Sequence, residues 1–237
     1  MKKKILLLCA CLLFGANAFA DDISYLVTDL NMDNFWHKIG KQQEKVNMVT
    51  AKLLEKNKID KRTTVFIASK KINQAHTNLF YKDIVIYAGM LNIIDNDDEL
   101  AFLLGHEMAY SYEAYGGIIK YTAMKFNSKT YEYKADLKAI DYMVKAGYDP
   151  ISAIIFGNKT FEEPLYDWGW FATHPKGSKR LLAMYKYIYK KYPQYLTSEK
   201  TNSPYFKNVE YMFEDELKSF KHKETIRKQK QFKKEAI

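Results

Sequence analysis

The placement of cysteine limits how this chain can stabilise its fold. The two cysteines, Cys9 and Cys11, lie close to the N-terminus, and no cysteine follows them. Disulfide bonds and thiolate metal ligands are therefore excluded for the rest of the chain. Stability must come from a buried apolar core, and residues 21–237 are numerous enough to form one sizeable domain.

The first residues have the pattern of an export signal. Lysines at 2–4 precede an apolar run over 5–14, and a small-residue cleavage motif ends at Ala20. The apolar run is too short to cross a bilayer as a helix. We therefore predict a signal peptide over residues 1–20, cleavage near Ala20, and an exported, periplasmic protein.

The chain is basic, and much of the excess charge is C-terminal. It has 37 Lys and Arg against 28 Asp and Glu. Residues 218–237 alone hold eight Lys and Arg against two Glu. We interpret this segment as a solvated helix or tail, with contact to a membrane surface or an envelope protein as the alternative. For an exported chain we expect no nucleic-acid partner.

The apolar pattern predicts an α+β fold that is mainly helical with a small β-sheet. β-Branched residues predict strands over 63–68 and 83–87. Helical periodicity and capping residues predict helices over 24–57, from about 95 to 116, over 130–146, over 178–191 and near the C-terminus. We expect a single domain over 21–217, followed by the basic segment 218–237.

Residues 106–110 contain an incomplete zinc motif. In H-E-x-x-H, positions i and i+4 place two imidazoles on one face of a helix, around one metal ion. Here the residues are His106-Glu107-Met108-Ala109-Tyr110, so a phenol replaces the second imidazole. In such a site the glutamate accepts a proton from the attacking water and passes it to the leaving amine. Alone, however, an HE pair is a weak signal.

Two further segments carry side chains suited to the same chemistry. Glu132 and Asp136 stand four residues apart, so both carboxylates share one face of a helix. One can ligate a metal while the other accepts a hydrogen bond from the ligating imidazole. His174 precedes Pro175, which restricts the backbone of the loop that presents it.

In this order and spacing, the motifs resemble the gluzincin zinc metallopeptidases of the HtpX and CAAX prenyl protease type, in particular their soluble exported bacterial branch. The resemblance runs from about Val65 to Arg180. It rests on the segments Ile84 to Leu91, Glu99-Leu100-Ala101, Leu104-Gly105-His106-Glu107, Glu132-Tyr133-x-Ala135-Asp136, Ala146 to Pro150, and Thr173-His174-Pro175-x-x-x-x-Arg180.

The resemblance implies a metallopeptidase domain with one Zn²⁺ on an active-site helix. His106 and Glu132 would be zinc ligands, and Glu107 would be the general base. Asp136 would orient the ligand imidazole. His174 and Arg180 would lie near the cleft as catalytic residues.

The resemblance also implies a protein or peptide substrate. Strand 83–87, with Ile84, Val85, Ile86 and Tyr87, would be an edge strand that aligns an extended substrate by strand addition. Misfolded envelope proteins are the expected substrates, which implies a role in protein quality control.

Tyr110 leaves three outcomes open. Zinc is retained, either with Tyr110 as a phenolate ligand or with His174 as a replacement imidazole. Alternatively, the site holds no metal, and the chain is an inactive homologue that binds polypeptides as a chaperone or adaptor. In the third outcome Tyr110 is a plain aromatic core residue. We expect a zinc metalloendopeptidase, with the inactive homologue as the alternative.

Overall fold

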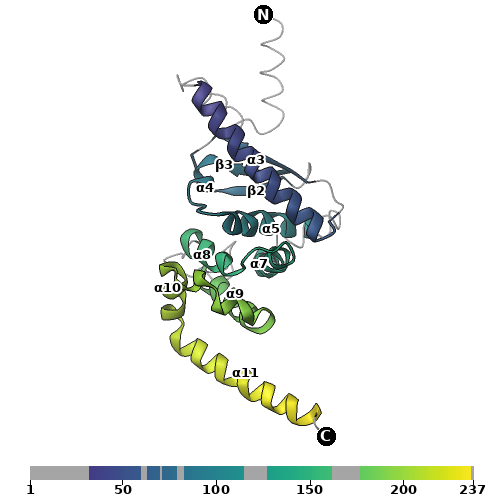
Figure 1. The fold of residues 1–237 in the computed structure, drawn as a ribbon, viewed down its shortest axis with the longest axis vertical. Coiled ribbons are helices and arrows are strands. Elements are labelled where there is room, and N and C mark those ends of the chain that lie inside the picture. The colour runs from purple at the N-terminus through teal and green to yellow at the C-terminus, as the bar shows by residue number, and fades with distance from the viewer. Residues whose placement is uncertain are drawn as a thin grey trace, which may run out of the picture. The chain divides into compact units, whose positions relative to one another are not determined.

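The computed structural model describes residues 32–59, 63–69, 71–78, 83–114, 127–161 and 177–235 (Figure 1). The predicted signal peptide and His174 lie outside these residues. Internal contacts divide the chain into an N-terminal unit, Met1–Asp95, and a C-terminal unit, Asn96–Ile237. Among the described helices, none has both the length and the apolar character that a membrane span requires.

The fold is α+β and mainly helical, as predicted. The N-terminal unit contains α3 (Met32–Lys56), β1 (Thr64–Ala68), β2 (Ala75–Asn78), β3 (Asp83–Tyr87) and α4 (Ala88–Leu91). The C-terminal unit contains α5 (Asp97–Ala114), α7 (Ser128–Lys145), α8 (Ile151–Thr160), α9 (Gly177–Lys191), the 3₁₀ turns η2 (Pro193–Thr197) and η3 (Glu199–Asn202), α10 (Pro204–Met212) and α11 (Glu214–Glu235).

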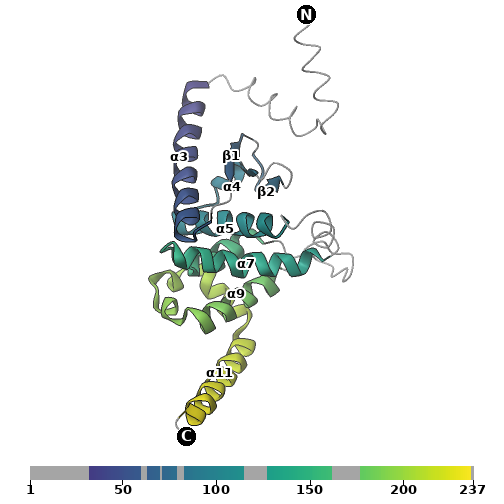
Figure 2. The ribbon, with the colours of Figure 1, turned by 90° about the vertical axis from the view of Figure 1, so that its right-hand side faces the viewer.

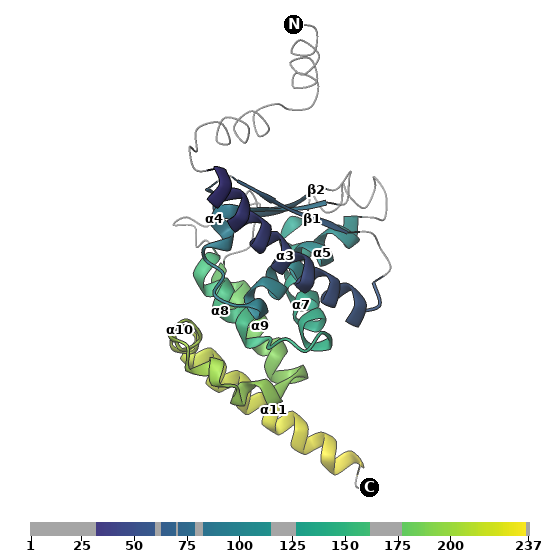
Figure 3. The ribbon, with the colours of Figure 1, turned by 45° about the horizontal axis from the view of Figure 1, so that its top comes forward.

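The sheet has the strand order β1-β3-β2. β3 pairs in parallel with β1 and antiparallel with β2. Figure 3 shows this sheet nearly edge-on, with β1 and β2 labelled. The expectation that residues 83–87 form an edge strand is therefore wrong, because β3 is the central strand. The sequence of β2, Ala75-His76-Thr77-Asn78, lacks the run of β-branched residues that marks β1 and β3, so the pattern did not predict this strand.

The two outer edges of this sheet differ. At β1, the side chain of Gln43 from α3 acts like a neighbouring peptide group: its Nε2 donates to Val65 O at 2.8 Å, and its Oε1 accepts from Ile67 N at 3.1 Å. α3 runs alongside the sheet within this unit (Figure 2). The amide therefore satisfies two backbone groups that would otherwise be open to another strand.

At the opposite edge, Gln74 O accepts a hydrogen bond from Tyr87 N at 3.0 Å. Because antiparallel pairing alternates, the peptide groups of His76 face β3, and those of Ala75 and Thr77 face outward. Among the described strands, none pairs with this outer side of β2.

The C-terminal unit stacks α5, α7 and α9 (Figure 2). A close approach between α5 and α7 occurs at Gly105, where an added Cβ would lie 3.3 Å from Cα of Ala139. Small residues at this point let the two backbones come together, next to His106. The predicted helix end at Gly147 is confirmed, since that residue has φ +74°, a conformation that glycine adopts at low cost.

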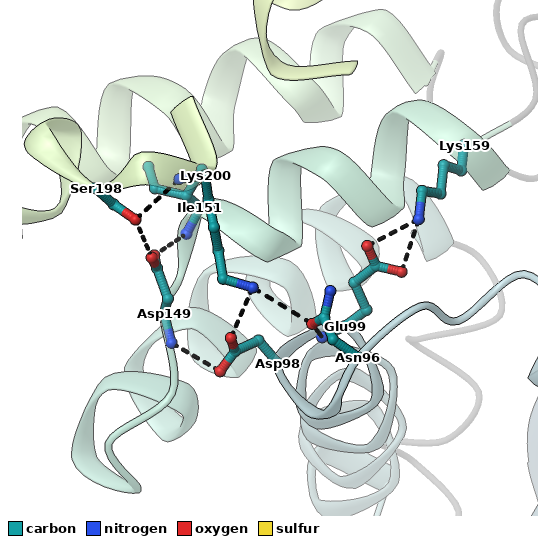
Figure 4. Close-up of polar contacts among 8 residues, drawn as sticks. All are labelled: Asn96, Asp98, Glu99, Asp149, Ile151, Lys159, Ser198 and Lys200. Atoms are coloured by element: carbon teal, nitrogen blue, oxygen red, sulfur yellow. Dashed lines mark hydrogen bonds and ion pairs between the residues drawn. The ribbon is translucent and has the colours of Figure 1, made fainter. Parts of the chain in front are cut away.

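The start of α5 is anchored to α8 and η3 by a polar network (Figure 4). Asn96 Oδ1 accepts from Glu99 N at 3.1 Å and caps the helix. Asp98 accepts from Asp149 N at 3.0 Å and pairs with Lys200 Nζ at 2.8 Å. Lys159 Nζ of α8 donates to both carboxylate oxygens of Glu99, at 2.8 and 2.9 Å.

The Glu99–Lys159 pair is buried, with side chains 1% and 6% exposed. A carboxylate at this depth depends on its partner, because it has little access to water. Helix α5 is thereby held in place two turns before His106.

We predict that Gly89→Ala destabilises the fold. An added Cβ would lie 2.5 Å from the carbonyl oxygen of Ile72, so backbone must move, at a cost of about 1–3 kcal/mol. Gly40 in α3 is the matched control, because nothing lies within 4 Å of its added Cβ. Gly40→Ala should stabilise by roughly 0.5–1 kcal/mol through helix propensity. Urea unfolding measures both, and equal midpoints for the two variants would contradict the close contact.

We predict that Lys159→Met destabilises the fold by about 3–5 kcal/mol, because it removes the ammonium partner of buried Glu99. Lys200→Met is the matched control. Its pair with Asp98 is 28% and 22% exposed, so the loss should be about 1 kcal/mol or less. The double variant Glu99→Leu/Lys159→Met should recover most of the loss. Denaturant unfolding tests the series, and similar losses for Lys159→Met and Lys200→Met would show that burial does not set the cost.

Candidate functional site

Three helices of the C-terminal unit bring together four residues singled out in the sequence. Helix α5 supplies His106, α7 supplies Glu132 and Asp136, and α9 supplies Arg180. Both carboxylates point to one side of α7 because they stand one turn apart. All four side chains are buried or nearly so.

The imidazole of His106 lies between the two carboxylates of α7. Its Nδ1 is 2.9 Å from Asp136 Oδ1, and its Nε2 is 3.6 Å from Glu132 Oε2. With the proton on Nδ1, the imidazole donates a hydrogen bond to the carboxylate of Asp136, and the lone pair of Nε2 is directed to the Glu132 side. This is the orientation that a metal-ligating histidine takes when a carboxylate fixes its tautomer.

The guanidinium of Arg180 contacts the carboxylates of both Asp136 and Glu132. Its Nε donates to Asp136 Oδ2 at 2.7 Å and its Nη2 to Oδ1 at 2.6 Å, a bidentate pair. Its Nη1 lies 3.1 Å from Glu132 Oε2. The ring of Phe161 covers the guanidinium, with its centroid 3.8 Å from Cζ. The sequence pattern gave no signal for this last contact.

The two carboxylates of the cluster favour the protonated forms of His106 and Arg180. Burial lowers the pKa of His106, but the hydrogen bond to Asp136 and the negative charges of Asp136 and Glu132 outweigh it, so the pKa is raised. Burial also lowers the pKa of Arg180, and the same two carboxylates reverse this and raise it. Positive charge on the imidazole is therefore favoured, whether a proton or a metal ion supplies it.

These residues fit part of a zinc site. Two ligand atoms about 2 Å from one tetrahedral zinc ion lie roughly 3.3 Å apart, close to the 3.6 Å between His106 Nε2 and Glu132 Oε2. The two carboxylates of Glu132 and Asp136, set against one guanidinium, leave an excess of negative charge that suits a divalent cation. Among the described side chains, no group of three or more His, Cys, Asp or Glu is arranged to hold a metal.

Tyr110 occupies the place of the missing imidazole on α5. Its ring stacks on that of His106, with centroids 6.4 Å apart and planes 20° apart. Phe102, one turn earlier, lies 6.2 Å from the same imidazole. Tyr110 is half-buried, unlike Met108 and Ala109 beside it, which are fully buried.

The other candidate residues belong to three different parts of the chain. Glu107 is half-buried on α5, next to His106 in the sequence. Ile84 to Tyr87 form β3 in the N-terminal unit. His174 lies outside the described residues, three positions before the start of α9.

The elements that carry this cluster are similar in sequence to a known protein family. The profile of peptidase family M48 matches residues 40–114 and 112–188, which together span well over half of the chain. The matched range includes His106, Glu107, Glu132 and Arg180. A comparison with curated proteins found no match. From the extent of the profile match, this chain belongs to peptidase family M48, a family of zinc metallopeptidases.

Proposed function

We propose that this chain is a zinc-dependent metalloendopeptidase that cleaves exported polypeptides, of the soluble HtpX-like type. The observation that carries the proposal is the placement of His106. Its Nε2 faces Glu132, while Asp136, clamped by Arg180, holds its Nδ1.

The energetic cost of this cluster supports its use in chemistry. Taking several charged groups out of water costs several kcal/mol per ion, and apolar replacements of similar volume are often neutral or stabilising. Asp136 is 1% exposed and Arg180 is 10% exposed at the side chain. A fold that needed only packing would gain nothing from these charges, whereas a metal ligand needs to be oriented.

The residues of the chain then take distinct roles. Zinc, when bound, acts as a Lewis acid that polarises the scissile carbonyl and lowers the pKa of water. Glu107 accepts the proton of the attacking water and delivers it to the leaving amine. Asp136 fixes the imidazole of His106. Arg180 is a positioning residue, because its guanidinium contacts the carboxylates of Asp136 and Glu132.

For the third ligand we favour His174 over Tyr110. A phenol has a pKa of about 10 and must lose its proton to ligate well. The excess of carboxylates around His106 opposes a further negative charge. His174 would restore two imidazoles and one carboxylate, a common set in catalytic zinc sites. It stands three positions before Gly177, where the helix that carries Arg180 begins, so the length of the chain keeps the two backbones within about 10 Å of each other.

The strand order changes the edge of the sheet at which we propose that an extended substrate binds. β3 is paired on both sides, and Gln43 occupies the outer edge of β1. We therefore transfer the proposed strand addition from residues 84–87 to the outer edge of β2, through the peptide groups of Ala75 and Thr77. Recognition through backbone groups suits a peptidase that acts on unfolded proteins. Export to the periplasm and a role in quality control of the envelope remain part of this proposal.

A second candidate is an inactive homologue that binds polypeptides as a chaperone or adaptor. The specific observation in its favour is Tyr110, whose ring lies against His106 where a second ligand is expected. Losing one of the protein ligands weakens zinc binding. The two candidates differ in metal content and in their response to a chelator.

We predict about one zinc per chain for purified residues 21–237 prepared without a metal-binding tag. His174→Ala should remove the metal, and His222→Ala, an exposed histidine of α11, is the matched control that should keep it. The reverse change, Tyr110→His, should raise zinc affinity by supplying the second helical imidazole. Elemental analysis and competition with a chelator measure each. Zinc retained by His174→Ala would rule out the replacement ligand.

We predict that Glu107→Gln lowers cleavage of an unfolded protein by about 10²–10⁴-fold while zinc content stays unchanged, because the general base is lost. Glu199→Gln, at an exposed position on η3, should have no effect. A chelator should stop cleavage by the parent chain. Suppression of aggregation that ignores both chelator and Glu107→Gln, without any cleavage, would favour the inactive homologue.

A further inference from the structure

The end of α8 brings an aromatic ring to the buried cluster of α5, α7 and α9. Helices α8 and α9 lie side by side within the C-terminal unit (Figure 1). Phe161 directly follows α8, and its N–H donates to Gly157 O at 2.8 Å. This hydrogen bond satisfies one of the last carbonyl groups of α8 and fixes the backbone from which the ring extends. The centroid of the ring lies 3.8 Å from Cζ of Arg180 on α9.

The ring is closely packed, although Phe161 is half-buried. An added Cβ at Gly157 would lie 2.9 Å from Cε2 of Phe161 and 3.0 Å from Cδ2 of Leu181. A side chain larger than hydrogen at position 157 would therefore have to displace the ring or its neighbour. The ring thus packs against the backbone of its own helix as well as against the guanidinium of α9.

The ring contacts the part of Arg180 that its hydrogen bonds leave open. A guanidinium donates only in its own plane, and donors of Arg180 in that plane contact Asp136 and Glu132. Its two faces are weakly hydrated and stack well on aromatic rings. An edge-on approach would place nitrogen atoms between Cζ and the ring, so a separation of 3.8 Å indicates that Phe161 covers a face.

One carboxylate oxygen links this contact to the candidate ligand. Asp136 Oδ1 lies 2.6 Å from Arg180 Nη2 and 2.9 Å from His106 Nδ1, so movement of the guanidinium is transmitted to the imidazole through a single atom. Arg180 is 8% exposed. Hydrogen bonds between charged groups are stronger where water is excluded, so loss of the ring would weaken this arrangement.

We propose that Phe161 is a positioning residue for His106. Its ring keeps water from one face of the Arg180 guanidinium, and so fixes the carboxylate of Asp136 that orients the imidazole. The consequence for zinc rests on the proposed function, whereas protection of the ion pair does not require metal. If the ring served packing alone, an apolar side chain such as leucine could replace it. Covering a guanidinium, in contrast, requires a flat ring.

The side-chain Nε–H group of Arg180 tests this contact by NMR in the metal-free chain. The chain contains three arginines, Arg62, Arg180 and Arg227, and Arg180→Lys assigns the signal of interest by removing it. In Phe161→Leu this signal should shift, because the ring current is lost, and its hydrogen exchange with water should become about tenfold faster. Phe161→Tyr keeps the ring and should leave the exchange rate within about twofold of the parent.

Phe206→Leu is the matched control for lost packing. Phe206 on α10 is 1% exposed and stacks on Tyr185 with centroids 5.7 Å apart, so this variant loses a more deeply buried ring from the same unit. It should lower the urea midpoint at least as much as Phe161→Leu, yet leave the Arg180 signal unchanged. In competition with a chelator, Phe161→Leu should weaken zinc binding by about tenfold, whereas Phe206→Leu should keep the affinity of the parent.

Other results would show which step is wrong. Unchanged exchange at Arg180 in Phe161→Leu, or equal acceleration in Phe206→Leu, would overturn the inference, because the ring would then serve packing alone. Faster exchange with unchanged zinc affinity would also overturn the positioning role, while the proposed function would stand. A parent chain that binds no zinc would contradict the proposed function instead, and exchange in the metal-free chain would then decide this inference by itself.

Discussion

The bidentate ion pair between Arg180 and Asp136 links the three helices that make up the candidate site. It connects α9 to α7, and Asp136 in turn accepts a hydrogen bond from His106 on α5. Because each partner is buried, neither can move without leaving a charge away from water. The position of the His106 imidazole therefore depends on Arg180, a residue seventy-four positions further along the chain, which no local pattern connects to it.

Around this pair the site combines intact and altered parts. Asp136, Glu132 and Glu107, for which we propose the roles of orienting carboxylate, ligand and general base, are all present, while the helical position of the second imidazole is occupied by Tyr110. Buried charges lower the stability of the fold, which favours a function for them. The missing imidazole, in contrast, lowers the affinity of the site for zinc. The proposed ligand His174 would resolve this conflict, because it would restore the ligand set without a change in α5.

The sequence predicted the elements whose pattern is strongly periodic or capped. Strand β3 has the predicted bounds, 83–87, α7 begins within two residues of its predicted start, and Gly147 follows the end of α7 in a left-handed conformation. The same approach missed β2, because Ala, His, Thr and Asn carry no strand pattern. It also missed α8, whose residues 151–157 are buried all round and so show no helical alternation. Missing β2 led directly to the wrong edge for the sheet.

Sequence alone determined which chemical groups this chain can use. It placed His106 beside Glu107, set Glu132 and Asp136 one turn apart, and excluded thiolate ligands, since these facts depend only on residue type and helical spacing. The tertiary structure decided which groups meet. That Arg180 holds both carboxylates, that Gln43 occupies one edge of the sheet, and that half of α11 is exposed all depend on contacts between residues distant in the chain. Such contacts are set by packing, which spacing along a sequence does not encode.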